Sequence, residues 1–307
     1  MTRFWLIKLL RTGITLWFVV TFAFIVLRTS GDPVVALLGA DAMPDEIEHF
    51  RELWGLDKSL FSQYISYIGQ MATGQFGNSL RDSRPVMTII LERLPATAEL
   101  GLAAFAIAAI IGIPAGIVAA LRRGRLTDRI VMVFAVFGFA LPNFFLGILL
   151  ILLFSLYLQV LPSSGTGTFR HLLMPAATLA TFTAGTLARF TRSAMLEVLE
   201  RPYMRAAAAR GVPFWQRVLF HALPNAAIPI VTVIGLNLGQ LVAGAIVVES
   251  VFAWPGIGRL LVVAVSQRDL AVVQGLVLVI AVTMVLANLI VDLLYGLLDP
   301  RIREGAK

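Results

Sequence analysis

The stretch LGLAAFAIAAIIGIPAGIVAAL, residues 100–121, contains no charged residue and decides the fold class. A helix rises about 1.5 Å per residue and a bilayer's hydrocarbon core is about 30 Å thick, so about 20 apolar residues cross it. Four further uncharged runs occupy residues 130–169, 171–188, 218–248 and 270–291. Of the 307 residues, 58% are hydrophobic and 14% are charged. These properties predict an all-α polytopic membrane protein.

The sequence predicts six membrane-spanning helices. In the first of them, Lys8 and Arg11 flank a shorter apolar run, and their side chains can reach the headgroup region. We expect this span to be retained rather than removed as a signal peptide, because no small-residue cleavage site follows it. Membrane β-strands would instead show short segments with strict alternation. The expected spans are residues 9–28, 96–121, 130–157, 172–194, 224–249 and 272–297.

The distribution of basic residues predicts the orientation of these spans. An even number of spans places both termini on one side of the membrane, and Lys and Arg favour the cytoplasmic side of short loops. Most of the 25 Lys and Arg residues lie on the side of the two termini, whereas the short loops of the other side carry few. We therefore expect both termini in the cytoplasm. The excess of basic residues on the cytoplasmic side, next to membrane lipid, explains the net charge of +7. We therefore expect no nucleic-acid partner.

Residues 29–95 form an external segment between the first two spans. A proline start and a glycine stop predict a helix over 44–54, and apolar residues at helical spacing predict a second over 59–72. Its acidic residues favour a solvated cap over a docking surface for an external partner, and both interpretations remain open. We divide the chain into residues 1–95, with the first span and this segment, and residues 96–307, a core domain with five spans.

The segment between the fourth and fifth spans, residues 195–223, is too polar to cross a bilayer but has a helical composition. Residues 206–209 are four alanines, which are strong helix formers. Gly211 suits a helix end, Pro213 suits the start of a second short helix, and Pro224 is expected to end that helix. The pattern predicts a rigid helix–turn–helix at the inner surface, which moves with the spans it joins and can therefore transmit force.

Two glycine pairs and two prolines inside the spans are expected to shape the bundle. Gly112 with Gly116, and Gly235 with Gly239, are spaced so that two helices can approach closely, more commonly within one subunit than between subunits. A proline removes a backbone donor, so we expect bends in the second and third spans. These prolines are Pro114 and Pro142.

At the cytoplasmic segment the chain resembles importer permeases of the ATP-binding-cassette class. Those permeases carry a Glu-Ala-Ala and Gly signature that ends in Leu-Pro, and the residues at its matching positions here are Ala206, Ala207, Gly211, Leu223 and Pro224. Arg205 and His221 replace its Glu and an Ile, which is typical of the dipeptide/oligopeptide/nickel branch. Other stretches that look like this branch are Gly31-Asp32-Pro33, Glu92–Thr97, Leu141-Pro142, Val248–Arg259 and Leu298–Arg303.

This resemblance implies a six-helix type I importer transmembrane domain in the inner membrane of a bacterium or archaeon. It implies pairing with a second homologous permease, two cytoplasmic ATPase subunits that each receive a coupling helix, here near residues 204–212, and an extracytoplasmic substrate-binding protein. The implied substrates are dipeptides, oligopeptides, glutathione-like peptides or nickel complexes, with peptides preferred. The residues assigned to the ATPase-coupling loop are Tyr203, Arg205, Ala206, Ala207, Arg210, Gly211, Leu223 and Pro224.

We expect neither catalysis nor a cofactor in this chain. It has no glycine-rich phosphate-binding loop, so ATP and Mg²⁺ are expected on the partner ATPase subunits. The histidines His49, His171 and His221 are scattered, and cysteine is absent, so neither a catalytic nor a metal-binding motif is formed. A secondary transporter driven by an ion gradient is the alternative, but such proteins usually show repeated halves and ion-binding residues at the midplane.

Polar residues at membrane depth are candidates for the translocation pathway, because they are costly in lipid. Asn237 and Gln240 are three residues apart and share one helical face. We expect that face to line the pathway together with Asn143, and with Glu249 near the outer end of the fifth span. Hydrogen bonding between helices is an equally good explanation of these residues.

Overall fold

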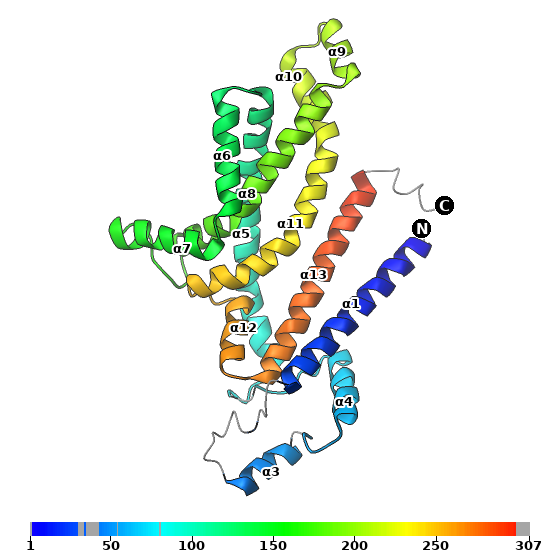
Figure 1. Cartoon of the computed structure of the whole chain (residues 1–307), viewed down its shortest axis with the longest axis vertical. Helices are drawn as coiled ribbons and strands as arrows, with labels where there is room; N and C mark the ends of the chain where they lie inside the picture. The colour runs from blue at the N-terminus through cyan, green and yellow to red at the C-terminus, as the bar shows by residue number, and fades with distance from the viewer. Residues whose placement is uncertain (1, 30–33, 35–42, 54, 80, 299–307) are drawn as a thin grey trace. The chain divides into compact units, whose positions relative to one another are not determined.

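The computed structural model describes residues 2–29, 34, 43–53, 55–79 and 81–298 (Figure 1). Within these ranges the assigned elements are helices, together with one isolated β-bridge between Asn78 and Pro85. The all-α prediction is therefore confirmed. The helices, with η marking π-helices, are α1 (Thr2–Thr29), α3 (Pro44–Leu53), α4 (Leu60–Ala72), α5 (Val86–Leu121), α6 (Leu126–Ala140), α7 (Asn143–Leu150), η1 (Ile151–Tyr157), α8 (Phe169–Leu199), α9 (Pro202–Ala209), α10 (Phe214–Gln216), η2 (Arg217–Ala222), α11 (Leu223–Val251), α12 (Ile257–Ser266) and α13 (Leu270–Leu298).

Several of these helices have the length and composition of membrane spans. Two helices meet both criteria alone: α5 and residues 270–289 of α13. Two bent pairs meet them together: residues 126–140 with 143–157, and residues 214–227 with 229–235. The apolar part of α1, Leu10–Val26, is shorter. The expected fourth span, residues 172–194, lies inside the 31-residue helix α8.

The expected third span is divided at Leu141 and Pro142. Both residues have extended backbone angles, and the helices on either side are bent by 105°. Pro142 lacks an N–H and disfavours a helical conformation for the residue before it, so the helix ends there. The bend expected at Pro142 is confirmed, but residues 130–157 are not one helix. By contrast, α5 continues as one helix through Pro114.

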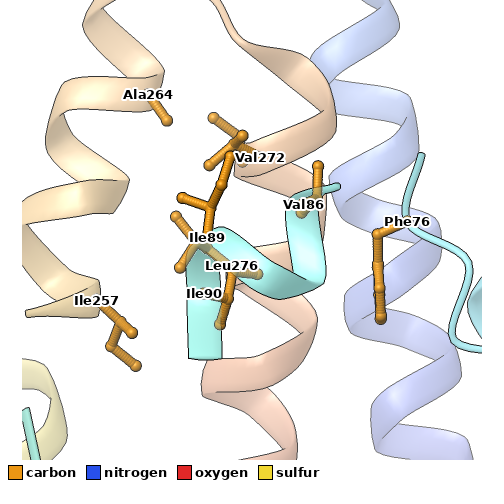
Figure 2. Packing of buried hydrophobic residues seen from close by; sticks show 9 residues of the cluster. Phe76, Val86, Ile89, Ile90, Ile257, Ala264, Val272 and Leu276 are labelled. Atoms are coloured by element: carbon orange, nitrogen blue, oxygen red, sulfur yellow. The ribbon is translucent and has the colours of Figure 1, made fainter. Parts of the chain in front are cut away.

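The chain forms two compact units, and the first comprises residues 1–96 and 255–285. Side chains from the start of α5 pack against α12 and α13, as Figure 2 shows. The buried residues of this cluster are Phe76, Val86, Ile89, Ile90, Ile257, Ala264, Val272, Val273 and Leu276. Beside it, Ser79 Oγ donates a hydrogen bond of 2.5 Å to Asp269 Oδ2. Residues 255–285 thus group with the first unit, and the division at residue 95 stays a prediction.

Helices α3 and α4 occupy the ranges expected for the segment between the first two spans, so this local prediction is confirmed. In the first unit, α4 packs on α1 through Tyr67, which lies with Val20 and Phe24 in a buried cluster. Tyr64 and Thr21 are joined by a hydrogen bond of 2.7 Å between their hydroxyls. Burial raises the pKa of Tyr67 to about 12, with a smaller contribution from Tyr64.

The second unit comprises residues 97–254 and 286–307, and α8 is its central helix. Glycines let α5 and α6 approach the α8 backbone: a Cβ on Gly112 or Gly116 would lie 2.6 or 2.5 Å from the carbonyl oxygen of Ala184 or Ala188. The close approach expected for this glycine pair is therefore confirmed, and it occurs within the chain. The corresponding expectation for the second glycine pair stays a prediction.

Candidate coupling site and translocation pathway

Helix α9 is held at the shared end of α8 and α11 by a single buried side chain (Figure 1). Met204 is 4% exposed and packs among Met195 and Val198 of α8 and Val218 and Ala222 of η2. The residues on either side of it, Tyr203 and Arg205, are exposed. Because the alanines that follow have no long side chains, α9 presents a smooth, basic surface while its other face is fixed to the bundle.

Gly211 ends α9 with a well-defined C-terminal cap. Its φ of +78° lies in the left-handed region that favours glycine. The N–H of Gly211 donates to Ala208 O at 3.0 Å, and the N–H of Val212 donates to Ala207 O at 3.1 Å. These two bonds form the Schellman motif, which satisfies the last helical carbonyls. The helix end expected at Gly211 is confirmed, but α9 itself spans 202–209 rather than 204–212.

The second arm of this segment passes directly into the fifth expected span. Pro213 is the N-cap of α10, as expected, and α10, η2 and α11 follow one another without a break. The expectation that Pro224 ends the second helix is wrong. Pro224 is the second residue of α11, and the helical backbone continues from η2 through it. We define the coupling segment as residues 200–224; its arms join α8 and α11 without a flexible loop.

A cavity of about 350 Å³ lies elsewhere in the second unit, and a second of about 310 Å³ lies beside α9. The smaller cavity is bordered by Arg205 and Arg217, with apolar residues of α5, α8 and η2. The guanidinium carbon of Arg217 lies 5.8 Å from the centre of the Phe214 ring. The cavity therefore combines positive charge with an apolar floor at the base of the coupling segment.

Two ion pairs join the α5–α6 turn and the first turn of α6 to the C-terminal part of α8. Arg192 binds Asp128 through two hydrogen bonds, of 2.6 and 2.8 Å, and Asp128 also accepts one from the N–H of Gly124 at 2.9 Å. The Asp128 side chain is 5% exposed. Arg123 pairs with Glu200, the C-cap of α8. Sequence reasoning missed the pair of Asp128 with Arg192. The signal available was that Asp128 is the one acidic residue within the basic stretch 122–129.

The structure places the expected pathway residues in different settings. Asn237 is buried and donates to the carbonyl oxygen of Val233 in its own helix at 2.7 Å. Glu249 is fully buried and accepts a hydrogen bond of 2.6 Å from Thr97 Oγ1 of α5. Asn143 begins α7 beside Gly244 of α11.

Some expectations lie outside the described part of the chain. The side chain of Gln240 is one of these, although its backbone belongs to α11. Gly31-Asp32-Pro33 and the stretch 299–303 also lie outside it. Among the described residues, no three His, Asp or Glu side chains form a group that could hold a metal.

The fold and the coupling segment define a helical component of a membrane transport system, and comparison with known families identifies that system. Residues 112–304 match the binding-protein-dependent transport system inner membrane component, and residues 1–101 match the N-terminal model of the same membrane components. The chain therefore belongs to the binding-protein-dependent transport permeases. It is a multi-pass inner-membrane subunit of an ATP-binding-cassette importer, in which partner ATPases hydrolyse ATP and a binding protein supplies substrate.

Several curated proteins are similar over most of their length. The di/tripeptide transport permease DppB of Pseudomonas aeruginosa is 42% identical, with 95% of this chain and 94% of that protein covered. The glutathione transport permease GsiC of Escherichia coli K12 is 44% identical over 89% of each chain. A solved chain from inward-facing MetNI, a methionine ABC transporter, matches with a TM-score of 0.57 and 19% identity, covering 69% of this chain and 97% of that one. This last likeness shows the fold alone.

Proposed function

We propose that this chain forms half of a peptide translocation pathway, beside a second homologous permease, two ATPase subunits and a peptide-binding protein. The peptide substrate is supported by the names of the similar permeases, which include di/tripeptide and glutathione systems. In this proposal the chain crosses the membrane six times with both termini in the cytoplasm. The residues 1–95 and 96–307 serve as N-terminal and core domains.

The single observation that carries the coupling mechanism is the attachment of α9. One face of α9 is anchored through Met204, while Tyr203 and Arg205 are exposed on its surface. Force applied to that surface by an ATPase subunit reaches α8 through the two residues before α9 and reaches α11 through α10 and η2. The exposed residues Ala206 and Arg210 and the partly buried Ala207 contact the ATPase in this mechanism, while Gly211, Leu223 and Pro224 set the geometry of the arms of the coupling segment.

The test is transport by the complete complex in proteoliposomes. ATP together with the loaded binding protein is expected to drive uptake of L-alanyl-L-alanine, and an imposed proton or sodium gradient without ATP is expected to drive none. Uptake by the permease alone in response to an ion gradient would instead support a secondary transporter. Replacing Asn143, Asn237, Gln240 and Glu249 singly then tests the pathway assignment, which fails if all four variants transport normally.

A further inference from the structure

Arg189 of α8 is exposed and lies over two aromatic rings of the second unit. The guanidinium carbon of Arg189, on α8, lies 5.7 Å from the centre of the Phe139 ring and 5.2 Å from that of Phe190. The Phe139 ring itself stacks on Phe182 of α8, with centroids 5.1 Å apart. We call Phe139, Phe182, Arg189 and Phe190 the aromatic–arginine cluster.

Arg192, one turn further along α8, differs from Arg189 because it has an acidic partner. Its charge is balanced by Asp128 through a two-point contact, and Asp128 is buried. Among the described residues, no acidic side chain forms an ion pair with Arg189. Arg189 and Phe182 are seven residues apart, so they lie on one face of α8, and Arg189 is exposed there.

The cluster lies on an exposed face of the second unit, where Phe139 is 53% and Phe190 42% exposed, and it is far from the α5–α6 turn. Phe139 is the penultimate residue of α6, whereas Asp128 lies in that helix's first turn. At about 1.5 Å per residue, the two positions are about 16 Å apart along α6. A cation at such depth is costly unless it faces a cavity, a partner or a ligand.

Arg189 is exposed, so its guanidinium is accessible to a ligand. Stacking on aromatic rings uses the flat faces of the guanidinium, while its N–H groups point outward in its plane. That edge matches a carboxylate, which accepts two parallel hydrogen bonds. Every unmodified peptide carries one such group at its C-terminus.

We propose that Arg189 binds the C-terminal carboxylate of a peptide during translocation, with Phe139 and Phe190 holding its guanidinium in place. This inference rests on the proposed peptide-import function. Arg189 is then a substrate-contacting residue that the basic-residue pattern of the sequence did not distinguish from its neighbours.

The absence of cysteine from the chain permits a direct test. In the complete complex in proteoliposomes, Arg189→Cys is expected to lower ATP-driven uptake of L-alanyl-L-alanine about 10- to 100-fold, because a hydrogen-bonded charge contact is lost. Modification with 2-aminoethyl methanethiosulfonate restores a positive charge and is expected to recover uptake several-fold. The 2-sulfonatoethyl reagent adds a negative charge and is expected to recover none. Saturating L-alanyl-L-alanine is expected to slow the modification of the Arg189→Cys variant by either reagent.

Two controls separate the possible outcomes. The complex with the wild-type chain, treated with both reagents, reports any effect on cysteines of the partner subunits. Ser193→Cys, at an exposed position of α8 outside the cluster, is expected to transport with equal activity after either reagent. Equal recovery of Arg189→Cys by both reagents, or no protection by the peptide, would overturn the carboxylate site and favour a lipid or packing role. Absence of ATP-driven uptake by the wild-type complex would instead overturn the proposed function itself.

Discussion

Replacing Gly211 tests whether a rigid α9 is needed for coupling. Gly211 has a φ of +78° and open space around the position of a Cβ, so alanine meets no steric contact and changes only the backbone energy. For a residue with a Cβ the left-handed conformation costs about 1–2 kcal/mol. The ratio of capped to frayed helix end then falls by about 5- to 30-fold. Proline also removes the N–H that bonds Ala208 O and cannot adopt a positive φ, so we expect a loss of about 3 kcal/mol or more.

The assay compares ATP hydrolysis with peptide uptake in the reconstituted complex. We expect uptake per ATP to fall in Gly211→Ala and to fall further in Gly211→Pro, while the amount of assembled complex changes little. Gly74 provides the matched control, because it has a φ of +72°, has equally open surroundings and follows α4, which lies outside the coupling segment. Gly74→Ala is expected to keep normal coupling. Equal loss of coupling in both alanine variants, or normal coupling in Gly211→Pro, would refute the argument.

Three further predictions concern contacts inside each of the two units. Asp128→Asn leaves the Arg192 charge unpaired, so we expect a loss of about 2–3 kcal/mol in thermal unfolding, partly recovered by adding Arg192→Gln; no loss would contradict the pairing. Ser79→Ala removes a hydrogen bond to the buried carboxylate of Asp269 and is expected to cost about 1–3 kcal/mol in the same measurement, whereas an unchanged stability would show the bond to be dispensable. The pKa of Tyr67 is about 12 in the folded protein, above about 10 in an unfolded chain. Below pH 10 both states keep the proton, and between about pH 10 and 12 only the unfolded state loses it, so stability is expected to fall with pH in that window. Unfolding midpoints of wild type and Tyr67→Phe should therefore diverge there, and parallel curves would contradict this.

The sequence predicted those features that depend on neighbouring residues. The end of α9 at Gly211 follows from a glycine two residues after a run of four alanines, and helices α3 and α4 follow from proline and glycine positions and from helical spacing. The membrane helices follow from length and hydropathy. Each of these features is decided within a few residues, so no knowledge of the tertiary structure is needed.

Features that depend on distant or ambiguous signals were missed. Pro224 is compatible both with the end of one helix and with the first residues of another, and its local sequence does not decide between them. Pro142 indicated a bend, but its angle depends on how α7 packs against α8 and α11. The Asp128–Arg192 pair joins residues 64 positions apart, and Met204 is buried only because α8 and η2 meet around it.

The most direct measurement of the central claim is cross-linking from the exposed face of α9. The variant Ala206→Cys introduces a single thiol into the otherwise cysteine-free chain, and it is labelled with a short bifunctional reagent in the assembled complex. We predict a cross-link to an ATPase subunit, with a yield that changes when ATP is added, and none from Thr73→Cys, whose thiol follows α4. Cross-links to the ATPase from position 73 and none from position 206 would contradict both the orientation and the coupling role of α9.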